Sequence, residues 1–187
     1  LLRRLQLTRR YVDGVRTHLD RLLDFSRLRN GHIDLHSESV DLSALVGSVI
    51  DEMAPMLEAA QCEVTTTFTM PLVGRWDRMR LRQVIWNLVS NAAKYAAGSP
   101  IEITTSRDET SVRLTVTDHG PGIAEHDQEL VFRRFERSGA EANHTGFGVG
   151  LWLVRRIVDA MGGKIELRSE LGRGATFTVT LPRTAAA

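Results

Sequence analysis

The sequence contains one cysteine and no apolar run of the roughly 18 residues that a membrane span requires. The single cysteine, Cys62, excludes an internal disulfide, and its alternating surroundings are typical of a small core or surface thiol rather than a catalytic one. The first ten residues mix four arginines with leucines, which is not the pattern of a secretory signal. We therefore expect a cytoplasmic segment that makes no membrane contact itself, with any membrane anchor of the full-length protein lying upstream.

Net charge is nearly absent as well. The 24 Lys and Arg residues almost balance the 23 Asp and Glu residues, which leaves a formal charge of +1. A chain of this kind has no global field that recruits nucleic acid, so we expect no nucleic-acid partner. Lysine is scarce, since Lys94 and Lys164 are the only two, and residues 1–30 carry eight arginines against three aspartates.

The first 31 residues have the pattern of one bundle-forming helix. Leu5, Val12 and Leu19 recur every seven residues, and Val15 and Leu22 repeat the spacing three residues later. This is an a/d seam, which further apolar residues widen into the stripe of a helix bundle. An Asn-Gly pair at residues 30–31 then stops the helix.

The remainder of the chain alternates helical and strand patterns. Asp41 and Asp77 are good N-caps for amphipathic helices over residues 42 to about 60 and 77 to about 97. Residues 32–40 fit a short strand or linker, residues 119–149 a long loop with one short helix near 128–135, and residues 150–161 a third helix. Alternating strands are expected at 64–70, 101–103, 112–116, 165–167 and 175–181.

Strands that alternate, rather than forming solid apolar runs, favour a sheet with one covered face. We therefore predict an α/β two-layer sandwich, with a mixed, mostly antiparallel sheet and helices on one face, preceded by the bundle-forming helix. The expected domains are residues 1–31, residues 32–183 and a loose tail over 184–187.

The helix over residues 77–97 has two faces of different character. Its core face carries Leu81, Val84, Ile85, Leu88 and Ala92. A second face carries Asn87, Asn91, Lys94 and Tyr95 at i, i+4, i+7 and i+8. Amide oxygens suit Mg²⁺, and a lysine suits phosphate, so this face can form a site. A merely solvated helix face explains the same spacing equally well.

Asp118 continues the phase of the core residues Val112, Leu114 and Val116, so its carboxylate points toward the core. A buried carboxylate is costly unless a group donates to it. The glycines at 120 and 122 follow at once and let a ligand approach the backbone. This acceptor could read an exocyclic amine such as that of adenine, or it could simply cap its own turn.

Alternate glycines, Gly146, Gly148 and Gly150, lead into the third helix. They expose backbone N–H groups at a helix N-terminus, where the dipole favours an anion such as phosphate. A flexible loop end is the alternative. The run matches neither a Walker loop nor a Rossmann fingerprint. A further segment, Gly172-Arg-Gly174-Ala-Thr176, reads by itself as a hairpin turn.

Taken in order, these segments resemble the catalytic domain of sensor histidine kinases in the GHKL superfamily. The matching motifs are the N box at residues 83–95, the first glycine box Asp118-His-Gly120-Pro-Gly122, the F box Phe132-Arg-Arg-Phe135-Glu-Arg137, the second glycine box at 146–151 and the last glycine box at 172–176. Phe147 and Val149 stand where the family often has Thr and Leu. Residues 22–42 resemble the second helix of the dimerisation and phosphoacceptor hairpin and its link to the catalytic domain.

The resemblance implies that ATP and ADP are ligands, with Mg²⁺ as a cofactor. Asn91 would ligate the metal with help from Asn87, and Lys94 and Arg137 would contact phosphate, so that Asn87, Lys94 and Arg137 are the catalytic candidates. The other candidates for nucleotide binding are Tyr95 against the adenine ring, Asp118 with Thr176 at the adenine amine, and Gly120, Gly122, Ile123, Phe135, Gly146, Gly148, Val149, Gly150 and Leu151. A homodimer through residues 1–30, if the hairpin is complete, and a response regulator are the implied partners.

One feature departs from the family. No histidine of this chain has the acceptor context, in which an acidic residue and then Thr-Pro follow; His18 and His126 both fail it. The predicted function is therefore transfer of the γ-phosphoryl group of ATP to a histidine outside this chain. A non-catalytic nucleotide-binding regulatory module is the main alternative, followed by a GHKL ATPase and a serine protein kinase. The arginines of residues 1–30 are either a solvated face or a docking surface for an acidic regulator.

Overall fold

The computed structural model describes residues 33–134 and 148–183. Contacts divide the chain into two units, Leu1–Asp34 and Leu35–Ala187, and the second contains every element described below. The bundle helix and the tail expected from the sequence lie outside the described residues. So do Phe135, Arg137 and Gly146 of the expected site.

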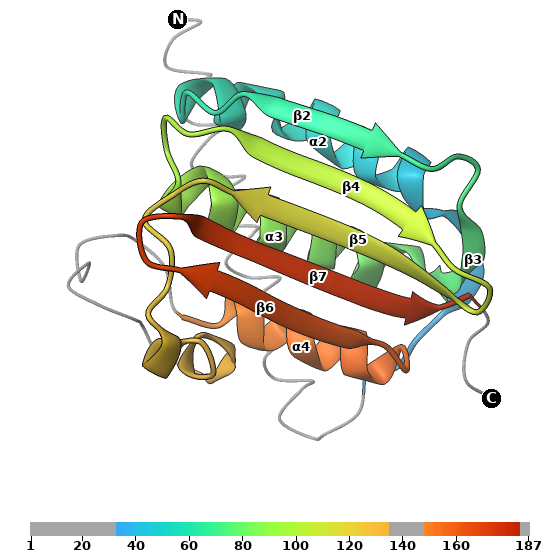
Figure 1. Ribbon diagram of the computed structural model, residues 1–187. Helices are drawn as coiled ribbons and strands as arrows, with labels where there is room; N and C mark the ends of the chain where they lie inside the picture. Colours follow the sequence, from blue (N-terminus) through green and yellow to red (C-terminus); the bar gives the residue numbers. More distant parts are fainter. Residues whose placement is uncertain (1–32, 135–147, 184–187) are drawn as a thin grey trace, which may run out of the picture. The chain divides into compact units, whose positions relative to one another are not determined.

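A five-stranded sheet forms one layer of this unit (Figure 1). Its order is β2 (Val64–Phe68), β4 (Ile101–Arg107), β5 (Ser111–Asp118), β7 (Gly174–Pro182) and β6 (Lys164–Glu170). The β2–β4 pair is parallel, and the other pairs are antiparallel. The sheet is thus mixed and mostly antiparallel, as predicted from the alternating strands.

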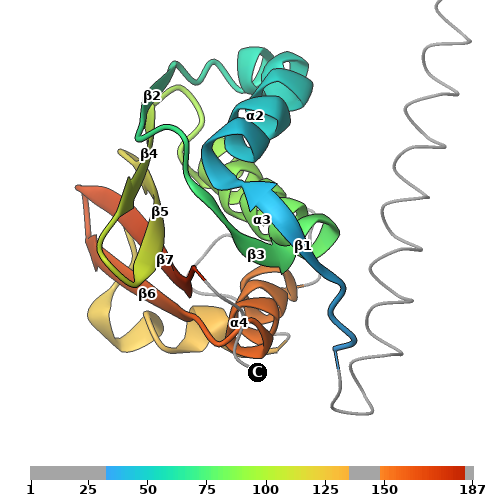
Figure 2. The same cartoon turned by 90° about the vertical axis from the view of Figure 1, so that its right-hand side faces the viewer.

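The α-helices described in this unit cover one face of the sheet (Figure 2). They are α2 (Leu42–Ala59), α3 (Arg78–Tyr95) and α4 (Gly150–Ala160). Asp41 caps α2 by accepting from the N–H groups of Ser43 and Ala44, and Asp77 caps α3 by accepting from that of Arg80. The apolar stripe of each helix and the inward side chains of β4, β5 and β7 form the buried core between the layers. The predicted two-layer sandwich and both predicted caps are confirmed.

The structure also contains a two-stranded sheet, of which the sequence predicts only the first strand. β1 (Ser37–Asp41) lies where a short strand or linker is predicted, but its partner β3 (Val73–Asp77) is not predicted. The strand pattern of β3 is hidden by Gly74, over whose backbone the ring of Trp76 packs. Trp76 is almost fully buried, and its Nε1–H donates to Pro182 O at 2.8 Å.

The loop after β5 also differs from the expectation. Instead of one short helix near residues 128–135, the described part of the loop contains two 3-10 helices, η1 (Glu125–Asp127) and η2 (Leu130–Phe132). Phe132 anchors the second one by packing edge-on against Phe177, with ring centroids 6.3 Å apart. A single buried aromatic residue fixes a short turn, but it does not supply the apolar stripe of a longer helix.

No helix within residues 33–134 and 148–183 has the length and apolar character needed to cross a membrane.

Candidate functional site

Asp118 ends the central strand β5 on the face that the helices cover. It belongs to a row of residues that crosses four strands on this face: Ile101, Asp118, Ala175 and Ser169. The carboxylate is 7% exposed. Its Oδ1 accepts from Gly120 N at 3.0 Å and from Ala175 N at 3.3 Å, whereas no described residue donates to its Oδ2. One oxygen is therefore held by the protein, and the other remains available to a ligand.

Burial raises the pKa of the Asp118 carboxyl above its ordinary value of 3.8, because the charged form loses hydration. The two backbone N–H donors and the neighbouring His119 oppose this effect by favouring the carboxylate. A desolvated carboxylate with one free oxygen gains strongly from a ligand that donates a hydrogen bond. The position and charge of Asp118 thus fit an acceptor for an amine.

The first and last glycine segments pack on each other around Asp118. A Cβ on Gly122 would overlap the carbonyl oxygen of Glu170, and one on Gly174 would overlap that of Asp118. Gly172 N donates to Pro121 O at 2.8 Å and ties the two turns together. The sequence places these segments far apart and reads the second one as a hairpin turn, but in the structure both line the same corner.

Thr176, which the sequence predicts to assist Asp118 at the adenine amine, lies apart from the Asp118 carboxylate. Thr176 pairs with Thr117 across β5 and β7, and the two hydroxyl oxygens lie 3.1 Å apart. Because side chains alternate along a strand, this pair lies on the opposite face of the sheet from Asp118. The residue that supports Asp118 is instead Ala175, through its backbone N–H.

The polar face of α3 is present, and its residues differ in exposure. Asn87 is 6% exposed, and its Nδ2 donates to Gln83 O at 2.8 Å, which orients the amide oxygen away from that bond. Asn91 and Lys94 are half-buried, whereas Tyr95 is 47% exposed. Lys94 Nζ donates to the Tyr95 hydroxyl at 3.1 Å and lies 4.5 Å from the centroid of its ring. The site therefore includes an ammonium group beside an exposed aromatic ring.

The N-terminus of α4 meets this face of α3. A Cβ on Gly150, the first residue of α4, would lie 3.0 Å from Asn87 Oδ1. Val149 is the N-cap, and its side chain makes no capping hydrogen bond to the first turn. The N–H groups of that turn and the helix dipole favour an anion. Gly148 precedes the cap, and Leu151 follows Gly150 half-buried, so the structure brings the described part of the second glycine box to Asn87.

The donor set around Asn87 also bears on metal binding. No group of three His, Cys, Asp or Glu side chains that could hold a metal occurs in the described parts of the chain. The Asn87 amide oxygen faces Gly150 and receives no hydrogen bond from a described residue. Neutral oxygen ligands fit Mg²⁺, which keeps several waters and takes phosphate oxygens from a nucleotide.

Two residues of the site were not found from the sequence. Ser169 Oγ accepts from Ile123 N at 2.8 Å and donates to Gly174 O at 2.6 Å. Gln128 Nε2 donates to Ser169 O at 2.8 Å and to Ile123 O at 3.2 Å. Both residues stand outside the glycine-rich segments, and a single Ser in an edge strand carries no recognisable pattern. The only available signal was its alternation phase, which places it on the covered face.

A buried acceptor, a helix N-terminus without a side-chain cap and an amide-bearing helix face, arranged under a mixed sheet, define a nucleotide-binding domain. Sequence comparison gives the family. Residues 76–185 match the family described as histidine kinase-, DNA gyrase B- and HSP90-like ATPases, and the chain belongs to it. It has the sequence and fold of the ATP-binding catalytic domain of sensor histidine kinases.

Individual curated proteins that are similar to this chain are sensor kinases. The chain is 36% identical over 164 residues to the adaptive-response sensory kinase SasA of Synechococcus sp. (strain JA-3-3Ab), covering 86% of this chain and 44% of that protein. It is 33% identical over 174 residues to the sensor histidine kinase MtrB of Mycobacterium leprae, covering 91% of this chain and 31% of that protein. The chain thus spans less than half the length of these relatives.

Solved structures show the same similarity. The catalytic domain of the histidine kinase ThkA superimposes with a TM-score of 0.71 at 28% identity, over 80% of this chain and 99% of that one. Full-length ShkA in complex with AMPPNP gives a TM-score of 0.77 at 32% identity, over 96% of this chain and 39% of that one. The predicted fold class and the predicted family are therefore confirmed.

Proposed function

We propose that this chain is the catalytic part of a sensor histidine kinase, which transfers the γ-phosphoryl group of ATP to a histidine outside the chain. The observation that supports this most directly is the meeting of Asn87 with Gly150. It places an amide oxygen at the N-terminus of α4, so one corner can hold both phosphate and metal. Phosphoryl transfer needs mainly such positioning and charge neutralisation.

The nucleotide base belongs at the other end of this site. The free Oδ2 of Asp118 would accept from the adenine amine, while Gly120 and Gly122 would form the turn beside the base. Gly120 itself is tightly placed, since a Cβ there would lie 2.7 Å from Ala96 Cβ. Tyr95 is exposed enough to lie against a ring, and Ile123 follows the glycine turn. These assignments rest on the burial of Asp118 and the exposure of Tyr95.

The phosphates would lie along α4 and α3. The N–H groups of the first turn of α4, beginning at Gly150, would donate to a phosphate oxygen, and Gly148, Val149 and Leu151 would shape that turn. Lys94 would neutralise phosphate charge as a point cation. Asn91 and Asn87 would hold Mg²⁺, which when bound would neutralise developing charge on the transferred group. Arg137, Phe135 and Gly146 would complete the site from outside the described residues.

An ATPase of the gyrase or chaperone kind is less well supported. Such an enzyme needs a general base that activates water. Helix α3 contains no Asp or Glu, and the position one turn before Asn91 is Asn87, whose amide cannot take a proton. The arrangement therefore favours transfer to a protein side chain over hydrolysis.

The remaining assignments concern the whole protein. We propose that residues 1–31 form the second helix of a dimerisation hairpin, that residues 32–183 form the catalytic domain, and that 184–187 are a tail. The homodimer and the response regulator expected from the sequence belong to this proposal. A cytoplasmic position for the chain, with a membrane anchor upstream, belongs to it too.

The test uses the protein extended upstream of Leu1 by about a helix hairpin. It is incubated with γ-labelled ATP and Mg²⁺, and the protein-bound label is then tested in acid and alkali. We expect label that acid removes and alkali preserves, which indicates phosphohistidine, and we expect Asn91→Ala to abolish it. Steady hydrolysis of ATP without bound label would overturn the proposal in favour of an ATPase. ATP binding with neither label nor hydrolysis would favour a regulatory module.

A further inference from the structure

Ser169 connects three parts of the site through one hydroxyl group. Its Oγ accepts from Ile123 N at 2.8 Å, at the end of the first glycine turn. A hydroxyl has only one proton, and Ser169 donates it to Gly174 O at 2.6 Å. Ser169 lies in register with Ala175, which in turn lies in register with Asp118. The hydroxyl is thus on the same face as the buried carboxylate.

The bond to Gly174 O acts on Asp118 through a single peptide unit. The carbonyl of Gly174 and the N–H of Ala175 belong to one planar group, so fixing its oxygen fixes the direction of its N–H. That N–H donates to Asp118 Oδ1 at 3.3 Å. A chain of hydrogen bonds therefore runs from Ile123 N through Ser169 and the peptide unit to Asp118, and such chains polarise their members in the same direction.

Neighbouring contacts hold this chain in place. Gln128 Nε2 donates to Ser169 O at 2.8 Å and to Ile123 O at 3.2 Å, so the residue that follows η1 is bonded to both partners of the Ser169–Ile123 bond. A Cβ on Gly122 would lie 3.2 Å from Gly174 O, the oxygen to which Ser169 donates. The hydroxyl, the glycine turn and the peptide unit are therefore packed as one group.

We propose that Ser169 is a positioning residue for purine choice, which orients the Ala175 N–H so that Asp118 stays a carboxylate with Oδ1 occupied and Oδ2 open. The inference rests on the proposed role of Asp118 as the acceptor for the base. A 6-amino purine presents a hydrogen-bond donor to Oδ2, whereas a 6-oxo purine presents an acceptor there. A fixed carboxylate accepts a hydrogen bond from the 6-amino group and repels the 6-oxo group. The carboxylate oxygen and the 6-oxo oxygen are both acceptors, so no hydrogen bond can form between them.

Without the Ser169 hydroxyl, the peptide unit loses the partner that sets its direction. The Asp118 carboxyl can then turn or take up a proton, and a protonated carboxyl can donate to a 6-oxo group. We therefore expect Ser169→Ala to weaken discrimination between purines rather than nucleotide binding in general. Ser169→Thr retains the hydroxyl and should retain the discrimination.

The test measures the dissociation constants of Mg·ATP and Mg·GTP by calorimetry on the full chain. We expect Ser169→Ala to lower the ratio of GTP to ATP dissociation constants by about tenfold, the size expected for one hydrogen bond to a charged group. Ser169→Thr should restore the ratio, and Ser169→Cys, a weak donor of similar size, should give an intermediate one. Thr178→Ala removes a hydroxyl from β7 on the face away from Asp118 and should leave the ratio unchanged.

The alternative outcomes separate the two ideas. If the native chain prefers ATP and Ser169→Ala keeps the native ratio, the inference is overturned, even if that variant melts at a lower temperature, because the serine then has a structural role only. If the native chain binds both nucleotides equally or binds neither, the proposed role of Asp118 as the acceptor for the base is overturned. The role of Ser169 depends on it and is then overturned as well.

Discussion

Gly174 lies so close to the backbone carbonyl oxygen of Asp118 that a Cβ atom on the glycine would overlap that oxygen. The two residues belong to neighbouring antiparallel strands, and the contact occurs where β5 ends and β7 begins. A turn and a carboxylate that are distant in sequence are thereby fixed relative to each other. Any side chain at position 174 would therefore displace the backbone of Asp118.

The first prediction compares Gly174→Ala with Gly172→Ala. Both glycines have a positive φ, 86° and 79°, so each alanine bears the left-handed penalty of about 1–2 kcal/mol. Only Gly174 has backbone in the way, because nothing lies within 4 Å of a Cβ at Gly172. We expect Gly172→Ala to lower the free energy of unfolding by that penalty alone and to keep ATP affinity. Gly174→Ala should lower the free energy of unfolding by more than about 3 kcal/mol and abolish most ATP affinity.

Denaturant titration and calorimetry with ATP measure the two effects. Equal losses of stability in the two variants would contradict the packing described at Asp118, because the strain in φ is nearly the same in both.

Much of this site could be predicted because it depends on local patterns. The caps Asp41 and Asp77, the polar face of α3 and the phase of Asp118 each follow from spacing along one element, and the structure contains them. Thr176 could not be placed, because one residue of register decides which face a side chain takes. Ser169 and β3 could not be found either, since their roles come from contacts with distant segments, with Ile123 for Ser169 and with Pro182 for Trp76 of β3.

The second prediction concerns Asp118→Asn. Asparagine can still accept from Gly120 N and Ala175 N through one oxygen, but it places an NH₂ group or a neutral oxygen where the adenine amine would donate. We expect ATP affinity to fall by about 10- to 100-fold, the range for a hydrogen bond to a buried charge. Calorimetric titration with Mg·ATP measures it, and native affinity in this variant would exclude Asp118 as the base acceptor.

Without nucleotide, the free energy of unfolding of Asp118→Asn should not fall as its ATP affinity does. Burial raises the folded-state pKa of Asp118, so its stabilising contribution is complete below the unfolded value of 3.8 and is lost as the pH rises through the folded pKa. At pH 7 the buried carboxylate is therefore a cost, and the neutral amide removes it. We expect Asp118→Asn to be at least as stable as the native chain at pH 7 in denaturant titrations. A clear loss of stability would show that the charge is compensated.

The third prediction is a pH dependence of purine choice. Below its raised pKa, Asp118 carries a proton and no longer favours a donor over an acceptor, so the preference for ATP over GTP should decline on acidification. His119 lies next to it, with Nε2 at 2.8 Å from Glu102 Oε1, and its electrostatic effect lowers the pKa of Asp118. The ratio of the two dissociation constants isolates the base, because both nucleotides have the same phosphates. Asp118→Asn is the control and should show a ratio that does not change with pH.

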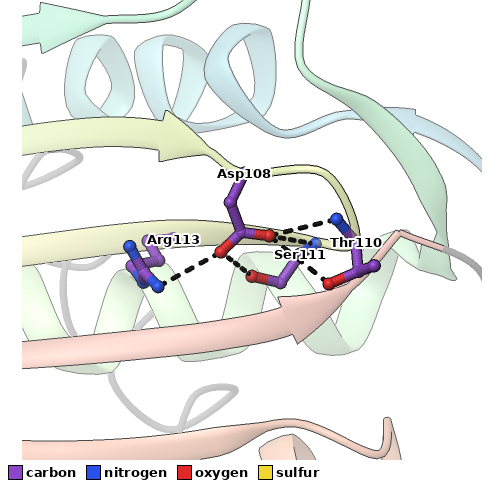
Figure 3. Close-up of polar contacts among 4 residues, drawn as sticks. All are labelled: Asp108, Thr110, Ser111 and Arg113. Carbon is purple, nitrogen blue, oxygen red and sulfur yellow. Dashed lines mark hydrogen bonds and ion pairs between the residues drawn. The ribbon is translucent and has the colours of Figure 1, made fainter.

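The fourth prediction concerns the turn at the other end of β5, where Asp108 accepts several hydrogen bonds (Figure 3). Its donors are Ser111 N and Oγ, each at 2.8 Å, and Thr110 N and Arg113 Nη2, each at 3.1 Å. The Ser111 hydroxyl, followed by the backbone N–H groups, lowers the pKa of Asp108. This stabilisation is present above the unfolded pKa and is lost as the pH falls through the folded one.

Asp108→Ala should therefore lower the melting temperature slightly at neutral pH, and the difference from the native chain should vanish in acid. ATP affinity should not change, because the turn precedes β5 and Asp118 ends it. Melting curves recorded over a range of pH check this, and a difference that persists at low pH would mean that the turn, rather than the charge, is responsible.

The last prediction tests the junction of α3 and α4 with Gly150→Ala. The new Cβ would lie 3.0 Å from Asn87 Oδ1, and the amide cannot simply turn away, because its Nδ2 is bonded to Gln83 O. Alanine favours a helix interior over glycine by about 1 kcal/mol, which offsets part of the strain at this contact, so the loss of stability should be small. The displaced oxygen should nevertheless lower Mg·ATP affinity by about five- to tenfold, a loss of roughly 1 kcal/mol.

Two further variants separate local strain from a general effect on helices. Gly47→Ala adds the same methyl group to α2, where it meets only Phe68 at an ordinary 3.9 Å, and should leave ATP affinity unchanged. Asn87→Ala removes the amide, so adding Gly150→Ala to it should cost no further affinity, since the two changes act through one contact. Additive losses in the double variant would show that Gly150 affects the nucleotide through the helix N-terminus itself and that the contact with Asn87 is incidental.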